Sequence, residues 1–254
     1  MAVLAAGGCR EHRHRSGSNA VRATITRNWP SSGISLVKVG EVDGDITVEA
    51  ATGNEISLLA TAKGDLEIKK GQENDGLFET KIVGDTLRIG RNESEREGIH
   101  FFWDMDDKKI DYVLKVPPTV SLVVMTVNGK IATRGVDGEM KATTVNGPIE
   151  IETAGTSELQ ASTVNGRVRA KFTRGFTGAR FKTVNGGVTA TLPAGASFAV
   201  NLSQVNGDFE ASFPLSIHSN PGSRRVSGDV NGGEHELKIT TVNGDVELAR
   251  LGGT

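Results

Sequence analysis

Apolar and polar residues alternate along much of this chain, and the alternation is centred on a repeated Asn-Gly pair. This period of two indicates strands with one buried and one solvated face, so we predict an all-β fold. Positions six and four before five of the Asn residues are Leu122 and Val124, Met140 and Ala142, Leu159 and Ala161, Ala179 and Phe181, and Val200 and Leu202. Positions three and five after an Asn are Ile131 and Thr133, Ile149 and Ile151, Val168 and Ala170, Val188 and Ala190, Phe209 and Ala211, and Val246 and Leu248.

The Asn-Gly pairs belong to a Val-Asn-Gly word that occurs seven times, and spacings of 18, 19, 20 and 21 residues separate the first five. Self-similarity at such a period predicts a repeat architecture. The sixth word, at Asn231, lies out of step and is interpreted as a loop or a broken repeat. The structural turn positions are Asn128, Gly129, Asn146, Gly147, Asn165, Gly166, Asn185, Gly186, Asn206, Gly207, Asn243 and Gly244.

We predict one β-repeat domain over residues 20–254, with regular repeats over 119–248 and an irregular insertion over 71–109. Asp43-Gly44 marks a weaker early copy of the unit, and Gly84-Asp85 marks a similar corner. Residues 1–19 are interpreted as an export segment followed by a disordered tether, because they pass from an apolar run to charged and His-rich sequence.

Two architectures fit the alternation. In a parallel β-solenoid the chain bends at each Asn-Gly and identical corner residues stack in ladders. In an antiparallel β-meander each Asn-Gly is a two-residue hairpin turn. The solenoid is favoured, because stacked coils reward identical residues at identical corners. Asn and Gly are attributed to the positive φ that a tight turn requires, although a ladder of Asn ligands lining a groove is an alternative.

Charge and cysteine content limit the partners and the compartment. The net charge is −2 over 254 residues, and the basic residues form no stripe with aromatics, so we expect no nucleic-acid partner. The single cysteine, Cys9, follows Ala-Ala-Gly-Gly in a setting similar to a lipobox. It is a candidate lipidation site, which would place the protein in the extracytoplasmic cell envelope with membrane contact only through that anchor.

Few residues suggest chemistry. The five His residues lack a nearby nucleophile, and the DMDD run at Asp104 lacks the ligand spacing of a calcium loop, so we expect no catalytic residue, cofactor or metal. Outward charges of mixed sign are scattered over the repeats. Phe101, Phe102 and Trp103 cannot all face one core, so they either cap the end of the array or form an interaction patch.

Several motifs together resemble the DUF4097 family of β-strand-repeat proteins, which carry an adhesin label inferred from architecture. They are Asp43-Gly44-Asp45-Ile46-Thr47-Val48, Asp111-Tyr112-Val113-Leu114-Lys115-Val116-Pro117, the Thr-Val-Asn-Gly series, Phe213-Pro214, and Thr241-Val242-Asn243-Gly244-Asp245-Val246. The resemblance implies a solenoid-type body in the bacterial envelope without established catalytic residues.

We therefore expect a non-enzymatic protein for adhesion, scaffolding or envelope-stress sensing, whose partner is a protein or an envelope or glycan surface. The alternative is a carbohydrate-active β-helix enzyme or a polysaccharide-binding protein. A convergent cluster of acidic and basic residues on one face would favour the enzyme.

Overall fold

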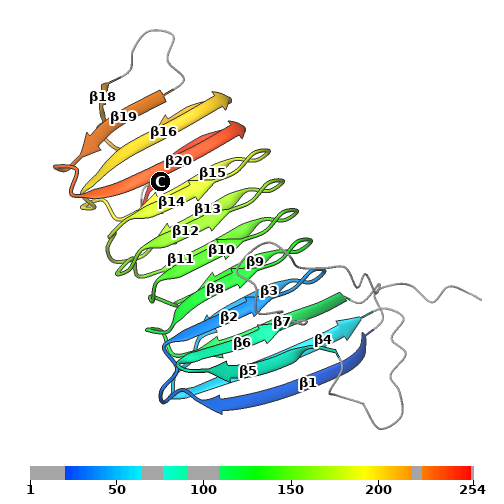
Figure 1. The fold of residues 1–254 in the computed structure, drawn as a ribbon. Helices are drawn as coiled ribbons and strands as arrows, with labels where there is room; N and C mark the ends of the chain where they lie inside the picture. The colour runs from blue at the N-terminus through cyan, green and yellow to red at the C-terminus, as the bar shows by residue number, and fades with distance from the viewer. Residues whose placement is uncertain (1–20, 64–76, 91–108, 219–224, 253–254) are drawn as a thin grey trace, which may run out of the picture.

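The computed structural model describes residues 21–63, 77–90, 109–218 and 225–252, and every regular element in these ranges is a β-strand (Figure 1). The strands form two long sheets that face each other. Sheet A has ten strands, in the spatial order β1 (Val21–Pro30), β4 (Glu55–Lys63), β7 (Lys109–Val116), β3 (Ile46–Ala50), β9 (Ile131–Arg134), β11 (Ile149–Thr153), β13 (Val168–Phe172), β15 (Val188–Leu192), β21 (Val246–Arg250) and β17 (Phe209–Ala211). Sheet B has 11 strands, in the order β18 (Ser216–His218), β19 (Arg225–Val230), β16 (Phe198–Asn206), β20 (His235–Asn243), β14 (Ala179–Lys182), β12 (Leu159–Ser162), β10 (Met140–Thr143), β8 (Ser121–Met125), β2 (Leu36–Gly40), β6 (Thr86–Gly90) and β5 (Glu79–Val83).

The repeats form a parallel solenoid, as predicted. The chain crosses from sheet B to sheet A at each Asn-Gly except Asn231-Gly232, so that β10 lies in one sheet and β11 in the other. Met140 in β10 pairs in parallel with Leu122 on one side and Leu159 on the other. The meander alternative is wrong, because the strands that flank an Asn-Gly pair with the neighbouring coils and not with each other. We name each coil by its corner residue, as in the Asn146 coil.

The apolar columns of the sequence meet between the two sheets. Every residue of the columns that precede the five Asn corners is at most 3% exposed. Burial of one such Val or Leu side chain contributes about 1.5–3 kcal/mol, so stacking supplies the cohesion. Phe209 and Ala211 are only half-buried, because β17 lies at the edge of sheet A. Phe176 fills the C-terminal part of the core, where its ring meets that of Phe198 edge-on at 5.7 Å.

The coils do not stack in sequence order at either end. The Asn243 coil (β20 and β21) lies between the Asn185 coil (β14 and β15) and the Asn206 coil (β16 and β17). Figure 1 shows β20 between β16 and β14. At the other end, the Asp43 coil (β2 and β3) lies between β6 and β7 on one side and the Asn128 coil (β8 and β9) on the other. The Asn243 coil and the Asp43 coil each therefore lie between two coils that follow one another in the sequence.

The segment expected to be an irregular insertion over 71–109 contains regular structure. Within it, β5 and β6 form an antiparallel hairpin whose turn is Gly84-Asp85, with φ +62° at Gly84. Leu87 and Ile89 of β6 are fully buried. The apolar-polar alternation of β6 matches that of the repeats, so β6 joins sheet B beside β2 although no Val-Asn-Gly word follows it. The remainder of that insertion, residues 71–76 and 91–108, lies outside the described residues.

Asn231 lies outside the corner ladder. It occupies the turn between β19 and β20, where its φ is +50°, and β19 runs antiparallel to β16. Its side-chain amide donates to the carbonyl of Ala196 at 2.9 Å. The interpretation of this sixth word as a loop or broken repeat agrees with that geometry.

Candidate functional site

The corner residues form a continuous hydrogen-bonded ladder along one edge of the solenoid. In each Asn the Nδ2 group donates to the side-chain oxygen of the corner residue on the neighbouring coil, over 2.6–2.9 Å. The spatial order of this Asn ladder is Asp43, Asn128, Asn146, Asn165, Asn185, Asn243 and Asn206. Asp43 stands where only an acceptor is needed, which suits a carboxylate because it cannot donate.

The reason for Asn at these corners differs from the one expected. Among the described residues other than glycine, only Asn231 has a positive φ, so the ladder Asn residues do not provide a left-handed turn. Each internal Asn side chain donates one hydrogen bond along the ladder and accepts another, because an amide carries both a donor and an acceptor. The same residue can therefore be repeated on every coil. The ladder is hydrogen-bonded to itself and is exposed along the edge.

Glycine follows each Asn because the coils approach too closely for a side chain. A Cβ on Gly147 would lie 2.1 Å from the carbonyl oxygen of Gly129, and one on Gly166 would lie 2.0 Å from that of Gly147. No real Cβ occupies such a position, and the obstacle is backbone on an adjacent coil. The Gly column is therefore a condition of parallel stacking.

The Thr of the Thr-Val-Asn-Gly word bonds the same glycine carbonyls from inside. Thr144 Oγ1 donates to the Gly129 carbonyl at 3.2 Å, and Thr163 Oγ1 donates to that of Gly147 at 3.1 Å. In the Asn206 coil, which has Gln in place of Thr, Gln204 Nε2 donates to the Gly244 carbonyl at 2.9 Å. The residue type changes there while the donor to a glycine carbonyl is kept, as expected for a carbonyl that needs a hydrogen-bond partner.

The Val of the same word faces solvent beside the Asn ladder. Val145, Val164, Val205 and Val242 are 36–42% exposed. Because the coils are in register, these side chains form an apolar row parallel to the amide row. This edge is regular, and apart from the Asp43 carboxylate at its end it consists of amide and aliphatic groups.

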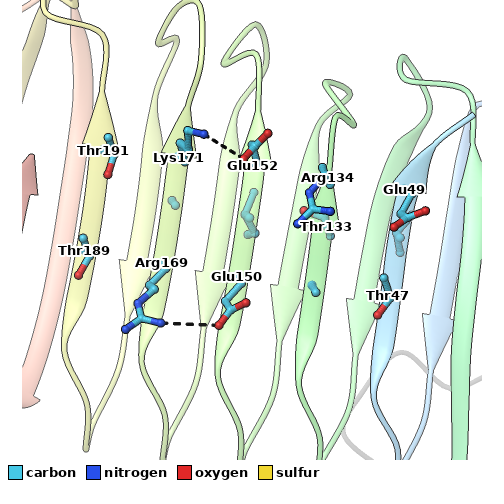
Figure 2. A pocket seen from close by; sticks show the side chains of 14 residues that line it. Thr47, Glu49, Thr133, Arg134, Glu150, Glu152, Arg169, Lys171, Thr189 and Thr191 are labelled. Atoms are coloured by element: carbon cyan, nitrogen blue, oxygen red, sulfur yellow. Dashed lines mark hydrogen bonds and ion pairs between the residues drawn. The ribbon is translucent and has the colours of Figure 1, made fainter. Parts of the chain in front are cut away.

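The outer face of sheet A carries a group of charges of both signs (Figure 2). A shallow groove of about 360 Å³ crosses β3, β9, β11, β13 and β15. Parallel register places alternating charges on neighbouring strands. The polar lining residues are Thr47, Glu49, Thr133, Arg134, Glu150, Glu152, Arg169, Lys171, Thr189 and Thr191.

Ion pairs occupy most of the groove's charged groups. Lys171 Nζ lies 3.1 Å from Glu152 Oε2, and Arg169 Nη1 lies 3.8 Å from Glu150 Oε1, as drawn in Figure 2. Lys130 also pairs with Glu150. The side chains of Glu150 and Glu152 are 37% and 40% exposed. Both carboxylates face cations across the strands, so the groove is an ion-paired surface.

The remaining sequence candidates lie mostly outside the described residues. Cys9 and the three aromatics Phe101, Phe102 and Trp103 fall in this group. The part of the chain that the structure describes contains no cluster of three potential metal ligands, and it has no helix long and apolar enough to cross a membrane. Sequence reasoning missed the groove, although aligning the residues four and six places after each corner residue would have placed its charges in rows.

The carboxylate of Asp111 in β7 connects neighbouring segments at the N-terminal end of the array. Asp111 accepts the backbone N–H of Asp45 at 2.9 Å and a hydrogen bond from Lys63 Nζ at 2.5 Å. Burial opposes ionisation of this carboxyl, but the bonds from Lys63 and Asp45 and the charge of Lys109 outweigh it. The pKa of Asp111 is therefore lowered from 3.8.

Comparison with known proteins places this architecture in a family. The family model described as Toastrack DUF4097 matches residues 19–249. A "putative cell adhesion protein" from Clostridium sporogenes is similar in structure, with a TM-score of 0.50 and 8% identity over 91% of this chain and 100% of the other. A "putative adhesin" from Bacteroides fragilis gives a TM-score of 0.46 and 12% identity over 89% of this chain and 97% of the other.

No curated protein is significantly similar to the chain in sequence. The family assignment therefore rests on the match to the family model, which covers nearly all of the described solenoid, and the likeness to the clostridial structure shows the fold alone. On that basis, the chain belongs to the Toastrack DUF4097 family.

Proposed function

We propose that the protein is a non-enzymatic module of the bacterial cell envelope that holds binding surfaces on a stiff solenoid for adhesion or scaffolding. The observation that carries this proposal is the unbroken Asn ladder, which ties seven coils together from Asp43 to Asn206. Networks of this kind fix neighbouring elements in one arrangement, so the outer faces keep a constant geometry. The adhesion label of the clostridial structure points in the same direction.

Adhesion is tested with beads coated with the full chain and passed over immobilised bacterial envelopes in a flow cell. Retention above that of beads coated with heat-unfolded chain supports the proposal, because only the folded solenoid presents its faces. Equal retention of both bead types contradicts it.

The enzyme alternative is tested on the groove of sheet A, since Glu150 and Glu152 are the acidic residues that line its centre. The chain is incubated with neutral and acidic polysaccharides, and new reducing ends are measured. We expect none. Product release by the chain that disappears in Glu150→Gln/Glu152→Gln would show that the groove is an active site and would overturn the non-enzymatic proposal.

Attachment at Cys9 is proposed on the sequence alone. Mass spectrometry of the N-terminal peptide of protein isolated from its own bacterium is expected to show a diacylglyceryl group on the Cys9 thioether. An unmodified Cys9 peptide would remove the lipid anchor from the proposal and leave the display role to be tested separately.

A further inference from the structure

The outer face of sheet B carries an in-register row of cations. Parallel pairing places the central outward residues of successive strands side by side across this sheet, which faces the viewer in Figure 1. In spatial order this cationic row is Lys81, Arg88, Lys38, Val123, Lys141, Gln160, Arg180, Lys238, Asn201 and Ser227. Lys182 lies two residues beyond Arg180 on the same strand.

This row differs from the face of sheet A. There, Glu49, Arg134, Glu152 and Lys171 alternate in sign across four adjacent strands. On sheet B the charges of the row are all positive, although like charges opposite each other destabilise a sheet. Outward acidic residues also lie on sheet B beside the row, among them Glu79, Asp229 and Glu236. The mixed scatter of outward charges expected from the sequence therefore holds for both sheets, and strand register separates out one central row of cations on sheet B.

Several of these cations lack a counter-charge. Lys38, Lys141, Lys182 and Lys238 make no ion pair or side-chain hydrogen bond with any residue that the structure describes. Arg180 does pair, with Glu236 at 3.0 Å. Of the four unpaired lysines, Lys141, Lys182 and Lys238 are exposed and Lys38 is half-buried. The argument rests on these four.

We propose that the cationic row is the docking face for a linear acidic polysaccharide with a carboxylate on its sugar residues. This inference rests on the proposed display function and names the partner of the module. From Lys38 to Lys238 the row crosses five strand spacings of about 4.8 Å, or about 24 Å. An extended polyanion laid along the row meets cations on β2, β10, β14 and β20, with Val123 and Gln160 on the two strands between.

The composition of the face favours a glycan over other polyanions. Single-stranded nucleic acid binds on aromatic stacking platforms, and the outward positions of the row contain no aromatic residue. Interfacial membrane binding gains strength from buried apolar area in addition to charge, and Val123 is the only apolar residue in the row. Gln160, Asn201 and Ser227 instead supply hydrogen-bonding groups between the charges, as sugar hydroxyls require.

The test is calorimetric titration of the full chain with a polygalacturonate oligosaccharide at low salt. The test variant is Lys141→Gln/Lys182→Gln/Lys238→Gln. The matched control is Lys115→Gln/Arg167→Gln/Arg174→Gln, which removes three exposed cations located off sheet B. Three surface charge contacts predict at least about a tenfold loss of affinity in the test variant and little change in the control. The methyl-esterified oligosaccharide is expected not to bind.

Absence of polygalacturonate binding, or an equal loss in both variants, overturns the docking face. So does equal affinity for a charge-matched single-stranded DNA or for anionic phospholipid vesicles that depends on the same three lysines. Cleavage of the oligosaccharide during titration would overturn the non-enzymatic proposal while leaving the docking face intact. The two proposals therefore fail on different observations.

Discussion

Asn243 donates its side-chain N–H to Oδ1 of Asn185, a residue 58 positions earlier, at 2.9 Å. On its other side, Asn243 accepts from Asn206 at 2.8 Å. One amide thus connects two coils that are consecutive in sequence and separated in space. The Asn ladder continues through this exchange of order without interruption, and the ladder is the basis of the first prediction.

Replacing an internal ladder Asn is expected to destabilise the fold. Asn165→Ala removes the hydrogen bonds to Asn146 and Asn185, and we expect a loss of about 1–2 kcal/mol in the free energy of unfolding. Asn165→Asp also removes the donor and places a carboxylate against Oδ1 of Asn146. Asp43→Asn is the matched control, because the end position needs only an acceptor. Urea titration measures all three, and equal stability of Asn165→Ala and the parent chain would contradict the role of the ladder.

Adding one methyl group at the Gly column is expected to be more damaging. In Gly166→Ala the new Cβ meets backbone 2.0 Å away on the adjacent coil, so the coils must separate and we expect a loss above about 3 kcal/mol. Gly195→Ala is the control, because nothing lies within 4 Å of its Cβ position. Thermal unfolding followed by circular dichroism compares them. Similar midpoints for the two variants would mean that the coils are not closely stacked.

The Thr hydroxyls are expected to stabilise through the glycine carbonyls. Thr163→Val keeps the shape of the side chain but removes the donor to the Gly147 carbonyl, at an expected cost of about 1–3 kcal/mol for an unsatisfied buried acceptor. Thr163→Ser keeps the donor and loses only a methyl group. Chemical denaturation should show that Thr163→Ser is more stable than Thr163→Val. The reverse order would mean that the shape of the Thr side chain, and not its hydroxyl, provides the stability.

Stability is expected to fall in acid partly through Asp111. Its pKa is lowered in the folded state, so its contribution is fully present above the unfolded value of 3.8 and is lost as the pH falls through the lower folded value. The pair with Lys63 is partly exposed, at 27% and 19%, so the contribution is about 1 kcal/mol or less. Asp111→Asn should show a smaller decrease in unfolding free energy between pH 6 and pH 2.5. An unchanged pH dependence would remove Asp111 as a contributor.

The sequence predicts the repeat unit better than the order of the units. Leu122, Val124 and their equivalents define the buried face, because the side-chain period of a strand is visible in one repeat. The position of the Asn243 coil is not visible there, because it depends on which coil leaves a compatible edge open. The cationic row is not visible in the sequence for the same reason, because only strand pairing brings Lys38 and Lys238 onto one surface.

The physical reason for Asn in the corner word is visible only in the structure. A φ value distinguishes an Asn that bends the chain, such as Asn231, from an Asn that bonds to the coil beside it, such as Asn146. Both are followed by Gly in the sequence. Pattern alone assigns them the same role, and only the contacts across coils separate them.

Insertion of the Asn243 coil also determines when the protein can finish folding. β16 and β17 are synthesised well before β20 and β21, which are their neighbours toward the middle of the array. Stacking from the N-terminal side therefore cannot pass the Asn185 coil until β20 and β21 have been synthesised. Until then an open sheet edge remains on both sides of the gap, and such edges are prone to pair with other chains.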